Sequence, residues 1–485
     1  MNTAGESGLR GLRGRPVLVV GAGVSGRSAA SALVELGAEV TVSNATPEQI
    51  EQLPPGMTGC AELAAPPAGT ELVVTSPGLR PSDPLLRAAA SAGIEVIGEP
   101  ELAWRWTRPG GPGERAGTPR WLVVTGTNGK TTTVGMLESI LKTAGRNAVA
   151  CGNIGYPVID AVRAGYRDLA VELSSFQLHW SSTITPAAGC LLNVAEDHLD
   201  WHGGMPGYVA AKARALRGEV AIVGVDDPLL ADVLDAAPAP RRVGITLAAP
   251  RPGQLGVLDG YLVDRAFTVD RAFTVDGGFT VDGAVGGEPN RLIGTDEVRP
   301  YGPPGWLDAL AASALARAAG VSAEQVADGL AAFQPGPHRG ALVGERDGVR
   351  YIDDSKATNP HAAAAALAGH RRVVWIAGGL LKGASVTELI LQHAHRLAGV
   401  VLMGTDRAMF RDALLRHAAE VPVLEVPPGD HEPMIDAVEK AAGLAAPGDV
   451  VLLAPAAASL DQFPSYAARG DAFAAAVTQV TAVTR

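Results

Sequence analysis

Short, strongly apolar runs alternate along the chain with longer stretches rich in Ala and Leu. In the first hundred residues the apolar runs occupy 16–20, 38–42, 71–75 and 94–97. Runs of this length that are rich in Val and Ile are typical of buried strands, and the stretches between them have the composition of helices. The alternation predicts a doubly wound, mostly parallel sheet, that is, a Rossmann-like α/β domain.

The same alternation resumes after a break. Residues 108–120 contain seven Gly or Pro residues among thirteen, which indicates a linker. Beyond it the pattern predicts a helix over 130–144 that follows a glycine-containing turn, and a helix from the capping-box pattern Ser322–Gln325 to about Phe333. The strands expected in this second part are at 121–125, 169–173, 189–193 and 221–225.

A third α/β pattern begins near His338, where the sequence QPGPH breaks the preceding helix. Its expected strands lie at 349–353, 372–377, 399–403 and 449–454. The length of 485 residues agrees with three domains at about 150 residues each. We therefore expect an α/β protein with an N-terminal domain over 1–112, a central domain over 113–335 and a C-terminal, Rossmann-like domain over 336–485.

Residues 265–282 contain the tandem repeat RAFTVD, RAFTVD, GGFTVD. Because the period of six is even, Phe267, Phe273 and Phe279 fall on one face of an extended chain. The Asp-Gly pairs that follow are turn signals. The repeat predicts a hairpin-like insertion rather than a functional element.

Charge and cysteine content narrow the class of protein. The formal net charge of −11 argues against binding to the nucleic-acid backbone or to an anionic membrane surface. Cys60, Cys151 and Cys190 show no C-x-x-C spacing, which fits a reducing compartment. Residues 1–16 lack the apolar core of a signal peptide, and no run of 18 uncharged apolar residues occurs. We expect a soluble cytoplasmic protein with no nucleic-acid or membrane partner.

The first candidate ligand site is the glycine-rich sequence from Gly21 to Gly26, which follows a strand and opens a helix. Such a turn lets backbone amides approach a phosphate at a helix N-terminus. A dinucleotide site would need Asp or Glu at the end of the next strand, where this chain has Asn44. The pattern favours a nucleotide ligand other than NAD, with a purely structural turn as the alternative.

The second candidate site is the sequence Gly126-Thr127-Asn128-Gly129-Lys130-Thr131-Thr132. It resembles a P-loop, in which backbone amides surround phosphates, the lysine reaches the β and γ oxygens, and the hydroxyl after it binds Mg²⁺. The strict pattern has glycine six positions before the lysine, where this chain has Val124. We interpret the segment as a shortened P-loop and the central domain as a P-loop ATPase-like domain.

Glu172 and His198 lie at the ends of two predicted strands downstream of the P-loop. Ligands gather at the carboxyl ends of parallel strands, and carboxylate and imidazole groups can ligate Mg²⁺. A paired carboxylate and a capping histidine are the alternatives. His198 and His202 are not part of an HExxH motif, and Ser174 and Ser175 lack a nucleophile elbow, so neither a zinc protease nor a serine hydrolase is expected.

Further polar residues lie at loop or strand ends. Lys212 falls in an apolar helical stretch, where the pattern alone favours a surface lysine that extends its amine to solvent, with a desolvated amine as the alternative. In the third domain, the segments around Arg339, Asp354 and Lys382 place cations and hydroxyls where a second anionic substrate or ATP phosphates could bind.

Taken in order, nine motifs resemble the Mur ligase family. The motifs are GTNGKTT, GNIG, ELSSFQL, NVAEDHLD, the lysine of YVAAKARAL, PHR, DDSKATN, GGLLKG and APAAASLDQF. They span nearly the whole chain, and DSKATN together with ASLDQF favours the D-glutamate-adding type. The resemblance implies an ATP-dependent ligase of peptidoglycan precursor synthesis. It would activate UDP-N-acetylmuramoyl-L-alanine as an acyl phosphate and join it to D-glutamate, acting as a monomer. A sibling amide ligase with another amino acid and a non-catalytic nucleotide-sugar-binding paralogue are the alternatives.

The resemblance also implies residue roles. Two Mg²⁺ ions would be held by Thr131, Glu172, His198 and Lys212, with Lys212 as a carbamate. The catalytic residues are Lys130, Glu172, His198 and Lys212. The UDP-substrate residues are Ser25, Asn44, Gly78 and Asn153. The ATP residues are Gly126, Thr127, Asn128, Gly129, Lys130, Thr131, Thr132, Arg339 and Asp354, and the D-glutamate residues are Thr358, Lys382, Ser459 and Tyr466.

One segment departs from the family pattern. Where relatives usually carry two asparagines that help bind adenine, this chain has Gly305 and Asp308. The loss of a buried hydrogen-bonding partner costs about 1–3 kcal/mol, which corresponds to about 5- to 150-fold in affinity. We therefore expect weakened ATP binding but not a dead enzyme.

Overall fold

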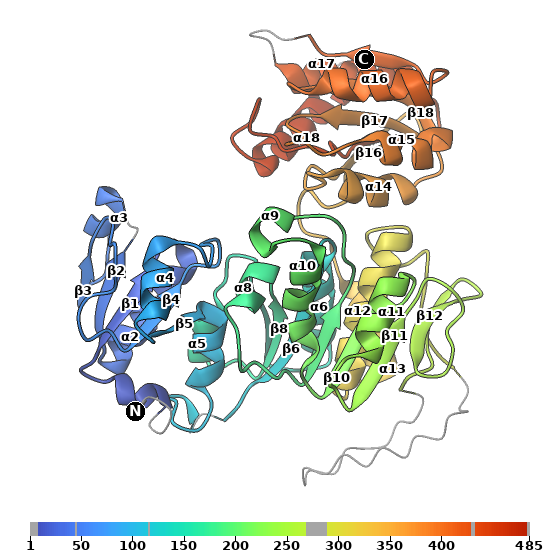
Figure 1. Ribbon diagram of the computed structural model, residues 1–485. Coiled ribbons are helices and arrows are strands. Elements are labelled where there is room, and N and C mark those ends of the chain that lie inside the picture. The colour runs from blue at the N-terminus through green and yellow to red at the C-terminus, as the bar shows by residue number, and fades with distance from the viewer. Residues whose placement is uncertain (1–7, 44–45, 115–116, 268–288, 428–431, 483–485) are drawn as a thin grey trace. The chain divides into compact units, whose positions relative to one another are not determined.

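The computed structural model of the protein describes residues 8–43, 46–114, 117–267, 289–427 and 432–482. Contacts divide the chain into two compact units, Met1–Ile293 with Leu307–Phe333 and Gly294–Trp306 with Gln334–Arg485. A five-stranded sheet and a nine-stranded sheet belong to the first unit, apart from the last residue of one edge strand, and a six-stranded sheet belongs to the second (Figure 1). The α/β fold class expected from the sequence is confirmed.

The N-terminal sheet has the order β3-β2-β1-β4-β5, and every pairing in it is parallel. Its strands are β1 (Pro16–Val20), β2 (Glu39–Ser43), β3 (Met57–Gly59), β4 (Leu72–Thr75) and β5 (Glu95–Gly98). The helices that follow are α2 (Val24–Leu36), α3 (Pro47–Glu51), α4 (Pro84–Ser91) and α5 (Glu99–Trp106), and a 3-10 turn covers Gly8–Leu12. The four expected strands are confirmed, and the short edge strand β3 was not predicted.

Strand β1 shows why a continuous apolar run forms a central parallel strand. Val17 and Val19 pack into one hydrophobic cluster, and Leu18 and Val20 pack into another on the opposite face. Both faces of the strand are covered, so no polar alternation is required.

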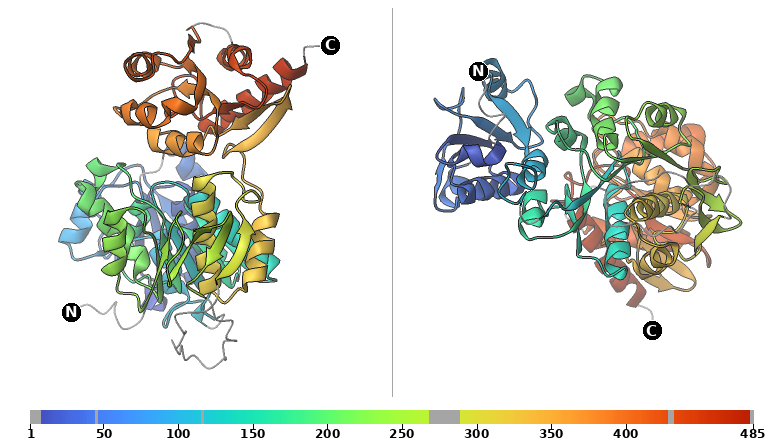
Figure 2. Two further views of the ribbon diagram at one scale, coloured as in Figure 1. Left: turned by 90° about the vertical axis from the view of Figure 1, so that its right-hand side faces the viewer. Right: turned by 90° about the horizontal axis from the view of Figure 1, so that it is seen from below.

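The central sheet has the order β14-β13-β12-β11-β10-β9-β6-β8-β7, with helices on both of its faces (Figure 2). Its strands are β6 (Arg120–Thr125), β7 (Ala148–Gly152), β8 (Asp168–Glu172), β9 (Ala188–Leu191), β10 (Val220–Gly224), β11 (Arg241–Ile245), β12 (Gln254–Leu258), β13 (Tyr261–Asp264) and β14 (Asn290–Gly294). The associated helices are α6 (Lys130–Thr143), α7 (Val158–Arg163), α8 (Ser175–His179), α9 (Leu199–His202), α10 (Met205–Ala213), α11 (Pro228–Asp235), α12 (Pro303–Ala318) and α13 (Ala323–Ala332), and a 3-10 turn covers Arg214–Leu216.

The signals that predicted the helix ends in this region are confirmed. Ser322 accepts from the amide of Gln325, whose side chain accepts from the amide of Ser322, so the capping box at the start of α13 is complete. Arg120, placed in the predicted linker, is instead the first residue of β6. The repeat at 265–282 lies almost entirely outside the described residues, which resume at residue 289.

The second unit is built on the sheet β15-β16-β20-β17-β18-β19, in which β15 and β16 are antiparallel and the other pairs are parallel. Its strands are β15 (Ala341–Arg346), β16 (Val349–Asp353), β17 (Val373–Gly378), β18 (Leu397–Met403), β19 (Val423–Glu425) and β20 (Val450–Leu453). Its helices are α14 (Pro360–Ala368), α15 (Thr387–His393), α16 (Arg407–His417), α17 (Pro433–Leu444) and α18 (Tyr466–Ala482), and a 3-10 turn covers Ala394–Arg396.

Trp375 at the centre of this sheet is fully buried and packs edge-to-face on Phe410, with ring centroids 6.0 Å apart. Its Nε1 donates to the carbonyl of Ala454 at 2.7 Å, so the polar end of the indole is also satisfied. The four strands expected in this part of the chain are confirmed. Among the helices that the structure describes, none has the length and hydropathy that a membrane span needs.

Candidate active site

The predicted P-loop connects β6 to α6 at the carboxyl edge of the central sheet. Asn193, which follows β9, holds it in place. Its Oδ1 accepts from the amides of Thr127 and Asn128, at 3.1 and 2.9 Å, and its Nδ2 donates to the carbonyl of Asn128 at 3.1 Å. The loop is therefore fixed by a side chain from the neighbouring strand.

The last glycine of the loop is required for two reasons. Gly129 has a φ of +85°, which favours glycine, and it precedes the first residue of α6. A Cβ at this position would lie 2.2 Å from Oδ1 of Asp308. The start of α6 thus lies directly against an acidic side chain of α12.

Two lysines converge on one carbonyl of the loop. Nζ of Lys130 donates to the carbonyls of Gly126 and Thr127, both at 2.9 Å, and Nζ of Lys212 donates to the carbonyl of Gly126 at 2.7 Å. Lys212 is 1% exposed. Burial, with a further contribution from the charge of Lys130, holds the pKa of Lys212 well below its ordinary value. The expectation of a surface lysine at this position is wrong, because the side chain of Lys212 turns inward beneath the loop.

A hydroxyl and a carboxylate meet beside the lysines. Oγ1 of Thr131 donates to Oε2 of Glu172 at 2.8 Å, and Nδ2 of Asn153 donates to Oε1 of Glu172 at 3.0 Å. Glu172 is 2% exposed and ends β8. Thr132, the last residue of the predicted loop, is the third residue of α6.

His198 lies at the rim of this region. Its side chain is half exposed, its Nε2 is 3.3 Å from Oδ2 of Asp197, and its φ is +53°. Its ring centroid lies 4.7 Å from that of Phe176. Among the described residues, no three His, Cys, Asp or Glu side chains gather in the way that a preformed metal site requires. The residues expected to bind Mg²⁺ instead include a hydroxyl, a carboxylate, a histidine and a lysine, namely Thr131, Glu172, His198 and Lys212.

Of the four residues expected to bind the UDP-substrate, three belong to the N-terminal part of the chain, whereas Asn153 follows β7 of the central sheet. Ser25 is the second residue of α2, and Gly78 is exposed in the loop after β4, where its carbonyl accepts from Nε1 of Trp201 at 3.4 Å. Asn44 lies outside the described residues. Gly26 packs so closely that a Cβ would lie 1.9 Å from the carbonyl oxygen of Gly21, which explains the small residue at this point of the turn.

In the second unit, Asp354 follows β16 at the start of the predicted DDSKATN segment. Burial, with a contribution from the charge of Asp353, raises the pKa of Asp354 to about 7 although the nearby Arg339 opposes the shift. The adjacent His338 pairs with Asp353, with Nδ1 2.6 Å from Oδ2. The structure thus brings the predicted ATP residues Arg339 and Asp354 close to each other within this unit.

The residues expected to hold D-glutamate are distributed over three loops and a helix start of the same unit. Thr358 is partly buried near the end of DDSKATN, Lys382 is exposed with a φ of +52°, and Ser459 is 4% exposed. Tyr466 opens α18, and its ring lies 3.8 Å from Nζ of Lys356.

Arg469, buried in α18, supports this segment from beneath. Its guanidinium donates to Oγ and to the carbonyl oxygen of Ser355, at 3.0 and 2.9 Å, and to the carbonyl of Ala457 at 3.1 Å. Oγ of Ser355 in turn donates to the carbonyl of Tyr466 at 2.8 Å. This network links the loop of Thr358 to the loop of Ser459.

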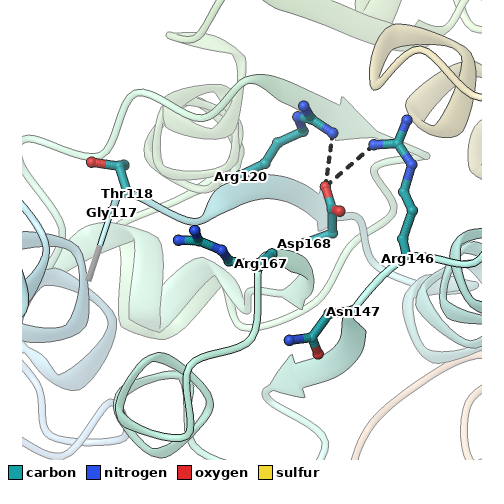
Figure 3. Close-up of a pocket in the computed structure, with 7 residues that line it drawn as sticks. All are labelled: Gly117, Thr118, Arg120, Arg146, Asn147, Arg167 and Asp168. Carbon is teal, nitrogen blue, oxygen red and sulfur yellow. Dashed lines mark hydrogen bonds and ion pairs between the residues drawn. The ribbon is translucent and has the colours of Figure 1, made fainter.

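A cavity of about 530 Å³ lies elsewhere, at the amino ends of β6 and β8 (Figure 3). Arg120 and Arg146 both approach Oδ1 of Asp168, at 2.8 and 3.6 Å, and both donate to the carbonyl of Ala319. These arginines tie the sheet to the segment after α12. Because the P-loop is at the carboxyl ends of the same strands, this cavity is not part of the candidate active site.

Several residues that contribute to the site were not predicted from the sequence. Asn193 stood within the NVAEDHLD motif but was not singled out, although an amide side chain directly after a buried strand was a usable signal. Asp308 was read only as a missing asparagine. The contact between Nε2 of His202 and Oγ of Ser175, at 2.9 Å, joins two segments that are distant in sequence, and no pattern pointed to it.

Comparison with known proteins agrees with this geometry. Residues 15–98 match the Mur ligase MurD-like N-terminal domain, residues 124–248 match the Mur ligase middle domain, and residues 338–457 match the Mur ligase glutamate ligase domain. The chain is 50% identical to the UDP-N-acetylmuramoylalanine--D-glutamate ligase of Rhodococcus jostii, with 98% of each chain covered. It is 51% identical to the protein of the same name from Thermobifida fusca, with 96% of this chain and 98% of the relative covered.

Solved structures share the fold at lower identity. The MurF protein of Acinetobacter baumannii has a TM-score of 0.57 and 18% identity, with 99% of this chain and 93% of that chain covered. UDP-N-acetylmuramate-alanine ligase MurC of Thermotoga maritima has a TM-score of 0.53 and 17% identity, with 96% of this chain and all of that chain covered. From the three domain matches and the near full-length relatives, the chain belongs to the Mur ligase family.

Proposed function

We propose that this chain is an ATP-dependent ligase that joins D-glutamate to UDP-N-acetylmuramoyl-L-alanine in peptidoglycan precursor synthesis. The observation that carries the proposal is the P-loop with Lys130 and Lys212 on one carbonyl and the Thr131–Glu172 pair beside it. The relatives at about half identity, whose names state this reaction, support it. The activity would proceed through an acyl phosphate, which converts a poor leaving group into a good one.

The P-loop residues would bind the phosphates of ATP. Backbone amides at the start of α6 favour anions through the helix dipole. Lys130, now bonded to two loop carbonyls, can exchange these neutral partners for phosphate oxygens, which are stronger acceptors. In the second unit, Arg339 and Asp354 would contact ATP phosphate and ribose.

The residues beside the loop fit Mg²⁺. Thr131 and Glu172 already present a hydroxyl and a carboxylate oxygen 2.8 Å apart, and oxygen ligands are those that Mg²⁺ prefers. Bound there, Mg²⁺ would neutralise charge that develops on the transferred phosphoryl group. His198 would serve a second ion from the rim of the site.

Lys212 fits a carbamate. A carbamate forms only from a neutral amine, and burial favours the neutral form of Lys212. The carbamate would supply an anionic oxygen where an ammonium group would repel a cation. Among the described residues, the amine of Lys212 donates a hydrogen bond to the carbonyl of Gly126 and has no carboxylate within ion-pair distance.

The remaining predicted residues would position the other two substrates. Ser25, Asn44, Gly78 and Asn153 would contact the UDP-substrate, and Thr358, Lys382, Ser459 and Tyr466 would hold the carboxylates of D-glutamate. The domain boundaries at 112 and 335, a monomeric state and a cytoplasmic location are part of the same proposal.

The test is phosphate release from ATP and Mg²⁺ in the presence of UDP-N-acetylmuramoyl-L-alanine and D-glutamate, L-glutamate or no amino acid. We expect release that requires D-glutamate, with a raised KM for ATP because Gly305 and Asp308 replace asparagines. Release driven equally by another amino acid would identify a sibling ligase instead. Tight binding of the UDP-substrate without release at any ATP concentration would identify a non-catalytic paralogue.

A further inference from the structure

The side chain of Asp308, on α12, lies against the start of α6. It belongs to the inner face of α12 and is 7% exposed. Its Oδ1 is 3.1 Å from Oγ1 of Thr133, in the first turns of α6, and closes on Gly129 so tightly that no Cβ fits there. The carboxyl group is thus in contact with the loop that would hold the ATP phosphates.

The hydroxyl of Thr133 reveals how this contact is made. Oγ1 of Thr133 is 3.1 Å from the carbonyl oxygen of Gly129 and also 3.1 Å from Oδ1 of Asp308. A threonine hydroxyl has one proton and can therefore donate only one of these two bonds. Both contacts are full two-centre hydrogen bonds at the same time when Asp308 carries a proton and donates it to Thr133; otherwise the two acceptors share the single hydroxyl proton of Thr133.

The charges around Asp308 favour that neutral acid. Burial raises the pKa of Asp308 well above its ordinary value, and the hydroxyl of Thr133 and the ammonium of Lys130 only partly oppose the shift. The thiol of Cys190, on β9, is buried nearby. Its pKa is raised by burial and also by the charge of Asp308, which shows that the two groups are close. Among the described residues, the titratable groups that interact with Asp308 are the ammonium of Lys130 and the thiol of Cys190, and the carboxyl group is 7% exposed.

Ionisation would disturb the loop in two ways. The proton of Thr133 would turn to the carboxylate, and the carbonyl of Gly129 would lose a partner. A negative charge would also stand beside the amides that receive the phosphates, where like charges repel. Both effects act against nucleotide binding.

We propose that Asp308 is a positioning residue of the phosphate-binding loop that acts as the neutral acid, so that nucleotide binding takes up a proton wherever Asp308 is ionised in the free protein. The inference rests on the proposed role of the loop in binding ATP. Asp308 occupies a position where related ligases usually have an asparagine. In this chain the side chain would support the phosphate-binding loop instead of contacting adenine.

Asp308→Asn separates this proposal from a merely structural role. An asparagine keeps the shape and can donate to Thr133 at every pH, so it imitates the neutral acid permanently. The experiment measures the Kd of ADP with Mg²⁺ by calorimetry between about pH 6 and pH 10, in buffers of different ionisation enthalpy. In the unaltered protein we expect Kd to rise by up to about tenfold per pH unit above the titration of Asp308, because one proton is linked to binding.

In D308N we expect the Kd of ADP to rise less steeply with pH, because the proton linked to Asp308 is missing. We also expect binding to take up correspondingly fewer protons. The nucleotide's own titration is common to both proteins, so their difference isolates Asp308. Asp328→Asn, on the exposed face of α13, is the matched control and should behave as the unaltered protein. Thermal unfolding checks that D308N is folded.

Two results would overturn the inference. Equal pH dependence and equal proton uptake in the unaltered protein and D308N would show that Asp308 carries no linked proton, while leaving the proposed function intact. A D308N protein that is folded but binds ADP at least tenfold more weakly at the lowest pH would show that an uncharged donor cannot replace the side chain. Absence of ADP binding in the unaltered protein would instead remove the proposed function and the inference together.

Discussion

Two regions of the molecule are expected to hold anionic ligands, and they are built differently. In the P-loop of the first unit, Asn193 and the two lysines already bind the loop backbone. In the second unit, the segment that contains Thr358 is held by Arg469 from beneath, while Lys382 is exposed. The first region is fixed by the groups that line it, and the second is fixed by groups behind it.

Ligand binding therefore requires different changes in the two regions. In the P-loop, phosphates would replace neutral carbonyl partners of Lys130 without rebuilding the backbone. In the second region, an exposed lysine must first be ordered, which costs side-chain entropy. We therefore expect the ATP end of the site to depend mainly on local geometry and the D-glutamate end to depend on its support.

The largest effect is expected from Lys212→Ala. If Lys212 carries the carbamate, the change removes a metal ligand worth about 4 kcal/mol, and turnover falls about 1,000-fold or more. A short carboxylic acid in the assay should restore part of the phosphate release. Lys142→Ala, on the exposed side of α6, is the matched control. Undiminished turnover in K212A would contradict the carbamate role.

The next largest effect is expected from Asn193→Ala. Asn193 makes three hydrogen bonds to the P-loop backbone, and their loss should weaken the loop by about 2 kcal/mol, or about 30-fold in the KM for ATP. The KM for D-glutamate should change little. Asn147→Ala, an exposed amide at the opposite edge of the sheet, should leave both constants unchanged. An equal rise in both constants would erase the contrast between the two regions.

Arg469→Met tests the support of the second region. The change removes the three hydrogen bonds that the guanidinium donates to buried acceptors and should lower the free energy of unfolding by about 2 kcal/mol. The KM for D-glutamate should rise about tenfold, while the affinity for ATP phosphates in the first unit changes less. Arg416→Met, exposed on α16, is the control in urea unfolding. A stable R469M protein with unchanged D-glutamate kinetics would show that the network plays no part in the site.

The sequence predicted those features that depend on local pattern. The strands at 16–20 and 349–353, the helix opened by Lys130 and the capping box at Ser322 follow from apolar period and turn chemistry, and all are confirmed. The short edge strands β3 and β19 were missed because three residues carry too little periodicity. The site motifs were found because their residues are close together in the chain.

What the sequence could not show is how distant segments meet. Lys212 reads as a surface residue in its own helix, and only the packing of α10 under the loop turns its amine to Gly126. Asp308 reads as a lost asparagine, and only the approach of α12 to Gly129 makes it a partner of Thr133. Gly305 likewise reads as a loss, yet a Cβ there would lie 1.9 Å from the carbonyl oxygen of Pro300, so this backbone leaves no room for an asparagine.

The smallest effect is expected from Asp354→Asn, and it depends on pH. The pKa of Asp354 is raised from 3.8 to about 7 in the folded protein. The folded state therefore holds the proton more tightly than the unfolded state, and stability that is complete at low pH is lost as the pH rises through about 7. Because the carboxyl is only partly buried, solvent screening limits the loss to about 1 kcal/mol.

Asp354→Asn should thus be as stable as the unaltered protein near pH 4 and more stable by about 1 kcal/mol near pH 8, as measured by urea unfolding. Asp412→Asn, exposed on α16, should show no such divergence. If D354N is more stable but binds ATP more weakly, the ionised Asp354 lowers the stability of the second region and contributes to ligand binding there. The two regions would then differ, because Asp308 beside the P-loop acts as a neutral acid. If D354N gains nothing above pH 7, the two regions do not differ in this respect, and the contrast rests on Arg469 and Asn193 alone.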